Sequence, residues 1–546
     1  MPSCPRNYPF YNWVPKPLGI LILLFLFLPI LTVGGTYSVN SGEMMSGLGI
    51  MSEHIQYASF ATSVGMAAFA PFFYQLVCIR RQKMMCLVGF SIMYLLSMVC
   101  AETDSIFLLA LCSVIMGFFR MVLMMVNLFT LIKYAFGMEA TRNITPGFEP
   151  TDEKGWDNLD VEKSNSQPII YLFFMILGQM GTWLTAWLAY EYEWQHVYYY
   201  MMGMLLVSIL LVFITMPYHK YVGHRFPITF PKFANVVMFC TFWMSLVYVF
   251  IYGKVLDWYA SENIWWATGI ALVSGVAFFL MDRYRKSPYF LWDIFKLRTI
   301  RMGVLLYLLL MILNSSSLLV SVFTGIGMKI DNWQNASLGN WCILGYVLGV
   351  IVILFLRNKG VHFRYLFALA FFFIGMSALF MYFEVQNAGM YERMKYPIII
   401  RTIGMLILYA LSAVYANQRM PYKYLSTWIC IMLTVRMVLG PSIGTALYTN
   451  VLQNRQQHYT TMYAAQTDAV TPETEMQFKR TVMGSKMQGR SEEEGLIMAS
   501  MSAKGKVQVQ ATLSALKEIA GWTFYGCFIS MIFVLVIRYP KRKLLT

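Results

Sequence analysis

The chain has 546 residues, of which 58% are hydrophobic and only 13% are charged, and its mean hydropathy is +0.56. Soluble domains carry about a quarter charged residues, so this composition excludes a water-soluble globular protein and indicates an integral membrane protein. The formal net charge is +15, and its placement along the chain decides whether a nucleic-acid partner is needed to explain it.

The apolar runs are about 20 residues long, which suits membrane-spanning helices rather than the shorter strands of a barrel. We therefore expect an all-α integral membrane protein with fourteen transmembrane helices. In chain order, hydropathy places the spans at 17–39, 52–76, 84–101, 105–132, 168–190, 196–216, 233–253, 263–281, 302–326, 339–356, 364–383, 396–417, 425–449 and 520–538. An even number of spans puts both termini on one side of the membrane.

The positive charges support this count. Most of the 42 Lys and Arg fall in loops on the side of the N-terminus, in segments such as "CIRRQK" and "DRYRKSPYFLWDIFKLRTIR". Because cytoplasmic loops are enriched in Lys and Arg, both termini are expected in the cytoplasm. The same bias accounts for the net charge, so no nucleic-acid partner is expected.

Two long segments lie outside the predicted spans. Residues 137–166 are acidic and rich in turn residues, which predicts a cytoplasmic loop. Residues 450–518 are expected on the opposite side. There the segment "SEEEGLIMASMSAKGKVQVQATLSALKEIAG" has helical composition, and the residues after 450 would continue the preceding span. Together they indicate an outer helical hairpin.

Motifs for enzymatic chemistry are missing from the sequence. No G-x-x-x-x-G-K-[ST] segment occurs, the six His are scattered, and the nine Cys lie singly. We therefore expect no metal site, no cofactor and no ATP-driven pump. A membrane-embedded enzyme is the rival class, but no nucleophile and base converge in the sequence. Many spans with Gly and Pro breaks are typical of a transporter.

Several stretches, in order along the chain, resemble the fourteen-helix drug:proton antiporter branch of the major facilitator superfamily, the multidrug efflux pumps. They are a basic turn before the third helix, a glycine in the fourth, a glycine-rich antiporter motif in the fifth, and an Arg followed by small residues in the thirteenth. The resemblance implies a role in conformational change for Arg80, Arg81, Gly117, Gly178, Gly181, Gly440, Pro441 and Gly444.

This resemblance implies a major facilitator fold with two six-helix bundles, residues 1–216 and 301–546, joined by two inserted helices in 217–300. It also implies proton-driven export of small amphipathic compounds by alternating access across a bacterial inner membrane. In Gram-negative relatives it further implies a periplasmic adaptor and an outer-membrane channel as partners. The alternative function is uptake or exchange of an organic anion by the same fold.

Two arginines, Arg120 and Arg436, lie near the middle of spans in opposite bundles, while Arg401 lies close enough to a helix end to snorkel. A charge at a helix centre costs about 2.5–3.5 kcal/mol on insertion scales, and no predicted span has a central carboxylate. One interpretation is that Arg120 and Arg436 face a substrate cavity and favour anionic or weakly acidic amphipaths. The other is that they cap backbone carbonyls or pair with carboxylates at helix ends, which locks the bundles.

Further polar side chains lie in or at the ends of apolar spans. They would line the substrate cavity or make hydrogen bonds between helices; these are Tyr37, Tyr57, Asn127, Gln179 and Asn314. Since His titrates near neutrality, His54 with Glu43 or Glu53 is the candidate for proton coupling. The acid that the family carries in its first helix is absent from 17–39.

Overall fold

The structure is a computed structural model that describes residues 9–37, 40–69, 82–136, 154–218, 230–285, 288–386, 389–417, 420, 424–466, 472–537 and 539. Every regular element in these ranges is helical, which confirms the all-α prediction. The main helices are α1 Lys16–Thr32, α2 Ser41–Leu48, α3 Ser52–Ala68, α5 Gln82–Glu102, α6 Ile106–Phe136, α7 Lys154–Glu191, α8 Gln195–Thr215, α9 Phe230–Tyr252, α10 Glu262–Arg283, α11 Arg298–Asn314, α12 Ser317–Val322, α13 Asn332–Gly339, α14 Trp341–Asn358, α15 Phe363–Glu384, α16 Lys395–Asn417, α17 Leu425–Leu433, α18 Gly440–Gln466, α19 Pro472–Met487 and α20 Glu492–Val536.

Within the described residues, 12 helical stretches are long and apolar enough to cross a membrane. The chain is therefore an integral multi-pass membrane protein. The first two predicted spans are occupied by α1 and α3, which have 17 residues each. Helix length and composition thus do not confirm that the chain has fourteen transmembrane helices.

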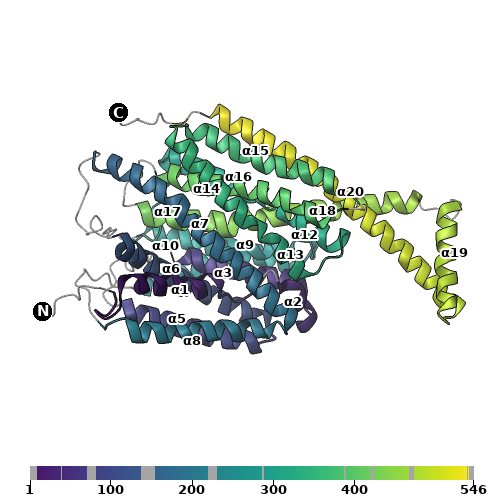
Figure 1. Ribbon diagram of the computed structural model, residues 1–546, viewed down its shortest axis with the longest axis horizontal. Coiled ribbons are helices and arrows are strands. Elements are labelled where there is room, and N and C mark those ends of the chain that lie inside the picture. The colour runs from purple at the N-terminus through teal and green to yellow at the C-terminus, as the bar shows by residue number, and fades with distance from the viewer. Residues whose placement is uncertain are drawn as a thin grey trace.

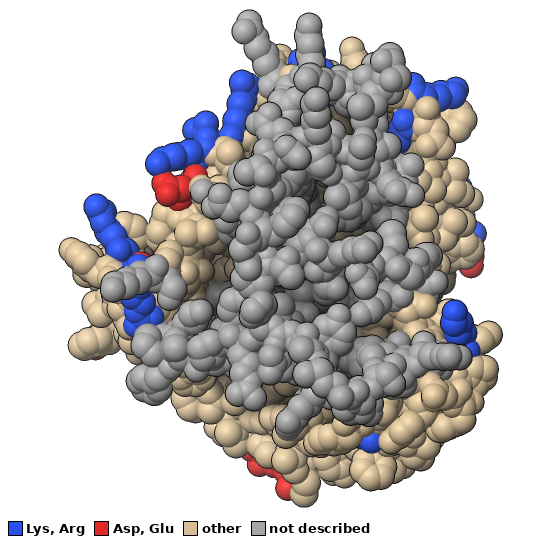
Figure 2. Space-filling model, turned by 90° about the vertical axis from the view of Figure 1, so that its left-hand side faces the viewer, with Lys and Arg blue, Asp and Glu red and all other residues tan. Residues whose placement is uncertain are grey.

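The first helix begins and the last helix ends at the same end of the bundle (Figure 1), which we call the terminal end. Arg364, at the start of α15, donates a hydrogen bond to the carbonyl of Ile537 there, at 3.0 Å. Seen from this end, Lys and Arg side chains stand around the rim of the bundle, with fewer Asp and Glu among them (Figure 2). This distribution agrees with the charge bias of the loops.

At the opposite end, which we call the arm end, α18, α19 and α20 project far beyond the bundle (Figure 1). The described residues of 450–518 form this arm. The long α18 and α20, of 27 and 45 residues, confirm the predicted helical hairpin. The separate helix α19 across its tip was not predicted. Docking of a periplasmic adaptor on this segment stays a prediction.

Glycines allow the helices to approach closely at three crossings. A side chain at Gly117 of α6 would overlap the carbonyl oxygen of Thr62 in α3, and one at Gly181 of α7 would overlap Thr32 of α1. Gly440 and Gly444 of α18 pack directly against α11. Small residues permit such contacts in membrane helices. Gly178 differs, because nothing lies within 4 Å of a Cβ built there.

The thirteenth predicted span is interrupted in its middle. Between α17 and α18 the backbone forms the π-helix η8, Thr434–Leu439. The next residues are Gly440 and Pro441, and proline has no N–H with which to continue the regular hydrogen-bond ladder. Such local π turns occur often at functional sites. The span therefore stays helical but departs from α-helical geometry at this point, and Arg436 lies within the π turn.

Two predicted boundaries are wrong, and a third predicted span has the expected extent but changes its helical geometry. The first span ends at Thr32 rather than at 39, where Pro29 weakens the helix and Gly34 and Gly35 follow. The predicted loop 137–166 is helical from Lys154 onwards, because polar residues continue a helix in water as readily as they form a turn. The span at 302–326 ends as a regular α-helix at Asn314 and continues through α12 and the π-helix η5, Phe323–Gly327.

The helices of 1–216 and those of 301–546 pack mainly among themselves. The inserted helices α9 and α10 pack against each other, and α9 also contacts α3 and α18. Helix α7 crosses between the two groups, since it contacts α1 and α8 on one side and α13, α14 and α16 on the other. The exact division of the chain into bundles at 216 and 300 stays a prediction.

The glycine contacts give a direct test of the packing. Gly117→Ala should lower the melting temperature of the purified protein, because overpacking a tight helix contact costs about 1–3 kcal/mol. Gly178→Ala is the matched control, and it should leave the melting temperature unchanged or raise it, since Ala favours helix over Gly by about 1 kcal/mol. Equal melting temperatures for the two variants would contradict the α3–α6 contact.

Candidate functional site

Arg436 lies deep inside the bundle. It is 11 residues beyond the start of α17, about 16 Å along a helix axis, and only 7% of its surface is exposed. The π-helix that carries it contacts α3, α11, α17 and α18. A permanently charged group therefore lies in the interior of the protein, about three helical turns from the start of α17.

Three tyrosines from three other helices surround this guanidinium. Its Cζ lies 4.2 Å from the ring centre of Tyr409 on α16 and 5.8 Å from that of Tyr171 on α7. Tyr307 on α11 holds Tyr409 in place, because the Tyr307 hydroxyl donates to the Tyr409 backbone carbonyl at 3.1 Å. Tyrosine rings attract cations through their negative faces. We call Tyr171, Tyr307 and Tyr409 the tyrosine cage.

The tyrosine cage does not neutralise Arg436. Its Nε and Nη1 atoms are buried and have no hydrogen-bond partner, and none of the ion pairs between described residues includes Arg436. A guanidinium has five donors in a planar fork that matches a carboxylate or phosphate. The site therefore has the donors of an anion-binding site and lacks an acidic partner among the described side chains.

Arg120 has a different role. Its Nη2 donates to the carbonyl oxygen of Leu31, in the last turn of α1, where helix carbonyls lack partners within the helix. This contact matches the interpretation in which a mid-span arginine caps carbonyls and ties helices together, although its Nε remains unpaired. The two arginines thus have different environments. Arg120 caps the end of α1, and Arg436 lies in the tyrosine cage.

Three of the predicted cavity residues pack elsewhere. Tyr37 follows the end of α1, and its hydroxyl accepts a hydrogen bond from the Gly34 amide at 3.3 Å. Asn127 is fully buried and faces Cys86 of α5. Asn314 is the last residue of α11, and its buried side-chain oxygen has no partner. The structure does not bring these residues to Arg436.

Gln179 belongs instead to a polar seam between α7 and α13 at the arm end. It donates to Asn340 at 3.5 Å, and Trp183 donates to Ser337 at 3.3 Å. Glu43, a predicted proton-coupling residue, extends the seam, since its two carboxylate oxygens accept from Asn332 at 3.0 and 3.1 Å. These contacts join the early helices to the late ones, and we call them the arm-end seam.

His54 and Tyr57 lie together on α3 and face the inserted helix α9. The His54 Nδ1 atom is hydrogen-bonded to the Tyr252 hydroxyl, and the Tyr57 ring packs against Tyr248 and Tyr252. Glu53 accepts a hydrogen bond from Ser52. Proton coupling through these residues stays a prediction. Arg80 and Arg81 lie outside the described residues.

Asp282, which the sequence did not single out, organises the terminal end of α10. Its carboxylate is 1% exposed and accepts from the Tyr289 and Phe290 amides and the Trp292 indole, at 2.5, 3.2 and 3.0 Å. The loop that it holds reaches α3, where the Tyr289 hydroxyl donates to the Ala68 carbonyl at 2.9 Å. The sequence signal that could have indicated this contact is the group of aromatic residues that follows shortly after an acidic residue at a helix end.

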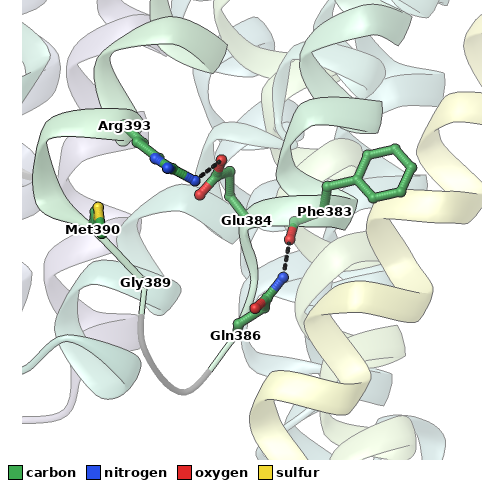
Figure 3. A pocket seen from close by; sticks show the side chains of 6 residues that line it. All are labelled: Phe383, Glu384, Gln386, Gly389, Met390 and Arg393. Atoms are coloured by element: carbon green, nitrogen blue, oxygen red, sulfur yellow. Dashed lines mark hydrogen bonds and ion pairs between the residues drawn. The ribbon is translucent and has the colours of Figure 1, made fainter.

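A surface pocket of about 240 Å³ lies at the arm end, between the end of α15 and the start of α16. Its arginine is already paired, because Arg393 lies 3.5 Å from Glu384 (Figure 3). Gln386 turns back towards the end of α15 and donates to the Phe383 carbonyl at 2.8 Å (Figure 3). The arginine of this pocket already has an acidic partner, whereas Arg436 has none among the described residues, so the surroundings of Arg436 are the better candidate site for an anion.

The different partners of the two mid-span arginines predict opposite effects on stability. Arg120→Gln should lower the melting temperature, because it removes the cap of α1. Arg436→Gln should raise it by the equivalent of about 2 kcal/mol, since an unpaired charge at this depth is costly. Thermal unfolding in the absence of solute measures both. A lower melting temperature for Arg436→Gln would show that the tyrosine cage already stabilises the cation fully.

Comparisons with known proteins bear on the fold. No protein-family model and no curated protein matches the sequence. Among solved structures, the nucleoside transporter NupG is 11% identical with a TM-score of 0.51, and the match covers 95% of this chain and 99% of NupG. The tetrameric PepTSo2 is 12% identical with a TM-score of 0.52, covering 95% and 97%. An auto-inhibited peptide transporter of the POT family is 10% identical with a TM-score of 0.51, covering 97% and 99%. These are transporters of the major facilitator type, and the chain shares their fold.

Proposed function

We propose that this protein is a secondary transporter that exports small anionic amphipathic compounds from the bacterial cytoplasm in exchange for protons. The observation that carries the proposal is the buried guanidinium of Arg436, which has two unpaired nitrogen atoms among aromatic rings. An acidic group on a solute would supply the missing acceptors, and the rings would contact its apolar part. By analogy of fold alone, the neighbouring transporters favour transport over catalysis.

The position of Arg436 supports alternating access. The tyrosine cage combines Tyr171 from an early helix with Tyr307 and Tyr409 from late helices. A solute bound to Arg436 would therefore contact both groups of helices and bias their relative position. Bistable packing of this kind converts local contacts into rigid-body movement. The arm-end seam would then open to release the solute.

Orientation and span number complete the proposal. Counting α1 and α3 with the 12 longer stretches gives fourteen spans, with the terminal end in the cytoplasm and the arm outside the inner membrane. A membrane potential negative inside then favours the exit of an anion by about 2.3 kcal/mol per charge per 100 mV. The electrical driving force thus agrees with export, while uptake or exchange of an organic anion remains the second candidate.

Substitution of the central cation tests the proposed substrate class. In proteoliposomes, Arg436→Gln should reduce transport of anionic amphipaths about tenfold or more, because a charge-assisted hydrogen bond contributes about 1.5–3 kcal/mol. Arg436→Lys keeps the charge but loses the planar fork, so it should fall between wild type and Arg436→Gln. The matched control is Arg393→Gln, which removes an arginine already paired with Glu384. Unchanged anion transport by Arg436→Gln would contradict the proposal.

Cross-linking the arm-end seam tests alternating access. A chain with Trp183→Cys and Ser337→Cys, treated with a short bis-methanethiosulfonate, should lose transport and regain it after reduction, because these positions join the two groups of helices. Each single variant and the wild type, treated alike, are the controls for the native cysteines. Full transport by the cross-linked double variant would show that the seam does not open.

A further inference from the structure

We propose that Arg401 forms a second anion subsite, so that the preferred solutes carry two anionic groups separated by an apolar middle. This inference rests on the proposed function, because it extends the site around Arg436 along α16. It concerns the one remaining arginine that the sequence places inside a predicted span rather than at its first residue.

Arg401 shares the feature that distinguishes Arg436. Its Nε and Nη1 atoms are buried without a hydrogen-bond partner, although the guanidinium is also hydrogen-bonded to the Cys342 side chain. The acids of the neighbouring arm-end segment are occupied, since Glu392 pairs with Lys395 at 3.0 Å and Glu384 pairs with Arg393 at 3.5 Å. Two buried nitrogens would stay unsatisfied if the side chain only snorkelled towards water, so the predicted snorkelling does not explain its position.

The two arginines are related through α16 and its neighbour α14. Tyr346 on α14 is 8% exposed, and α14 lies directly against α16 beside Arg401, since a side chain at Gly345 would overlap Thr402. Tyr409 in turn lies under Arg436. Arg401 and Tyr409 are eight residues apart on α16, which corresponds to about 12 Å along the axis. Arg401 is thus carried by α16 itself, while Arg436, on η8, lies over a ring that the same helix carries about two turns further on.

This arrangement matches a specific solute chemistry. Each guanidinium would bind one carboxylate, sulfonate or phosphate, and the tyrosine rings would contact the apolar segment that joins the two acidic groups. A monoanion of the same length would satisfy only one arginine. Arg401 would thus determine specificity, and Arg436 would bind both kinds of solute.

Matched linear acids test the assignment. Binding of sebacate, a linear dicarboxylate, and of decanoate, its monocarboxylate counterpart, is measured on the full-length protein in lipid nanodiscs at neutral pH. Wild type should bind sebacate about tenfold more tightly, because of the second charge-assisted contact. Arg401→Gln should remove this preference and leave decanoate binding unchanged, Arg401→Lys should retain part of it, and Arg436→Gln should weaken both ligands.

The outcomes separate the inference from the function on which it rests. A wild type that binds the two acids equally would overturn the second subsite, and this measurement does not depend on the folding of any variant. Equal loss of both ligands in Arg401→Gln would also overturn it, because Arg401 would then act on the whole site. If Arg436→Gln leaves the binding of both acids unchanged, the proposed function itself fails.

Discussion

The burial of a cation without a counter-charge is the constraint on which this structure depends. Arg436 keeps its charge at any physiological pH, and its depth prevents water from satisfying it. The tyrosine cage lowers the cost through cation–π contacts, at 4.2 Å to the ring centre of Tyr409, but leaves two nitrogens unpaired. Replacing a buried charge by a neutral group often stabilises a protein. We therefore propose that an anion occupies the site during the transport cycle.

The surrounding packing holds this charge where both groups of helices can respond to it. The π-helix η8 places Arg436 between helices, and Gly440 and Gly444 allow α18 to approach α11 directly behind it. Helix α7 contributes Tyr171 to the tyrosine cage and Gln179 to the arm-end seam. A movement of α7 would therefore change the solute site and the seam together. The capped Arg120, by contrast, belongs to the fixed packing of α1 against α6.

The sequence predicted the helical class, the depth of Arg436 and the helical arm, because hydropathy, charge placement and helical composition are local properties. It did not predict the tyrosine cage, since Tyr171, Tyr307 and Tyr409 are brought together only by tertiary packing. For the same reason, local pattern did not distinguish Arg120, which caps α1, from Arg436, or the close contact at Gly181 from the open space at Gly178. The prediction of a loop at 154–166 was wrong, because a polar composition is equally typical of a solvated helix and of a turn.

The central claim is that an anionic solute neutralises the buried charge and is moved by the protein. The most direct measurement is transport by the wild type in proteoliposomes, with matched anionic and cationic amphipaths and with imposed potentials and pH gradients of either sign. The account predicts that the anionic compounds move, that they accumulate on the arm side when the terminal side is negative, and that a pH gradient alters their rate. Transport of the cationic compounds alone, or of neither class under any gradient, would contradict it.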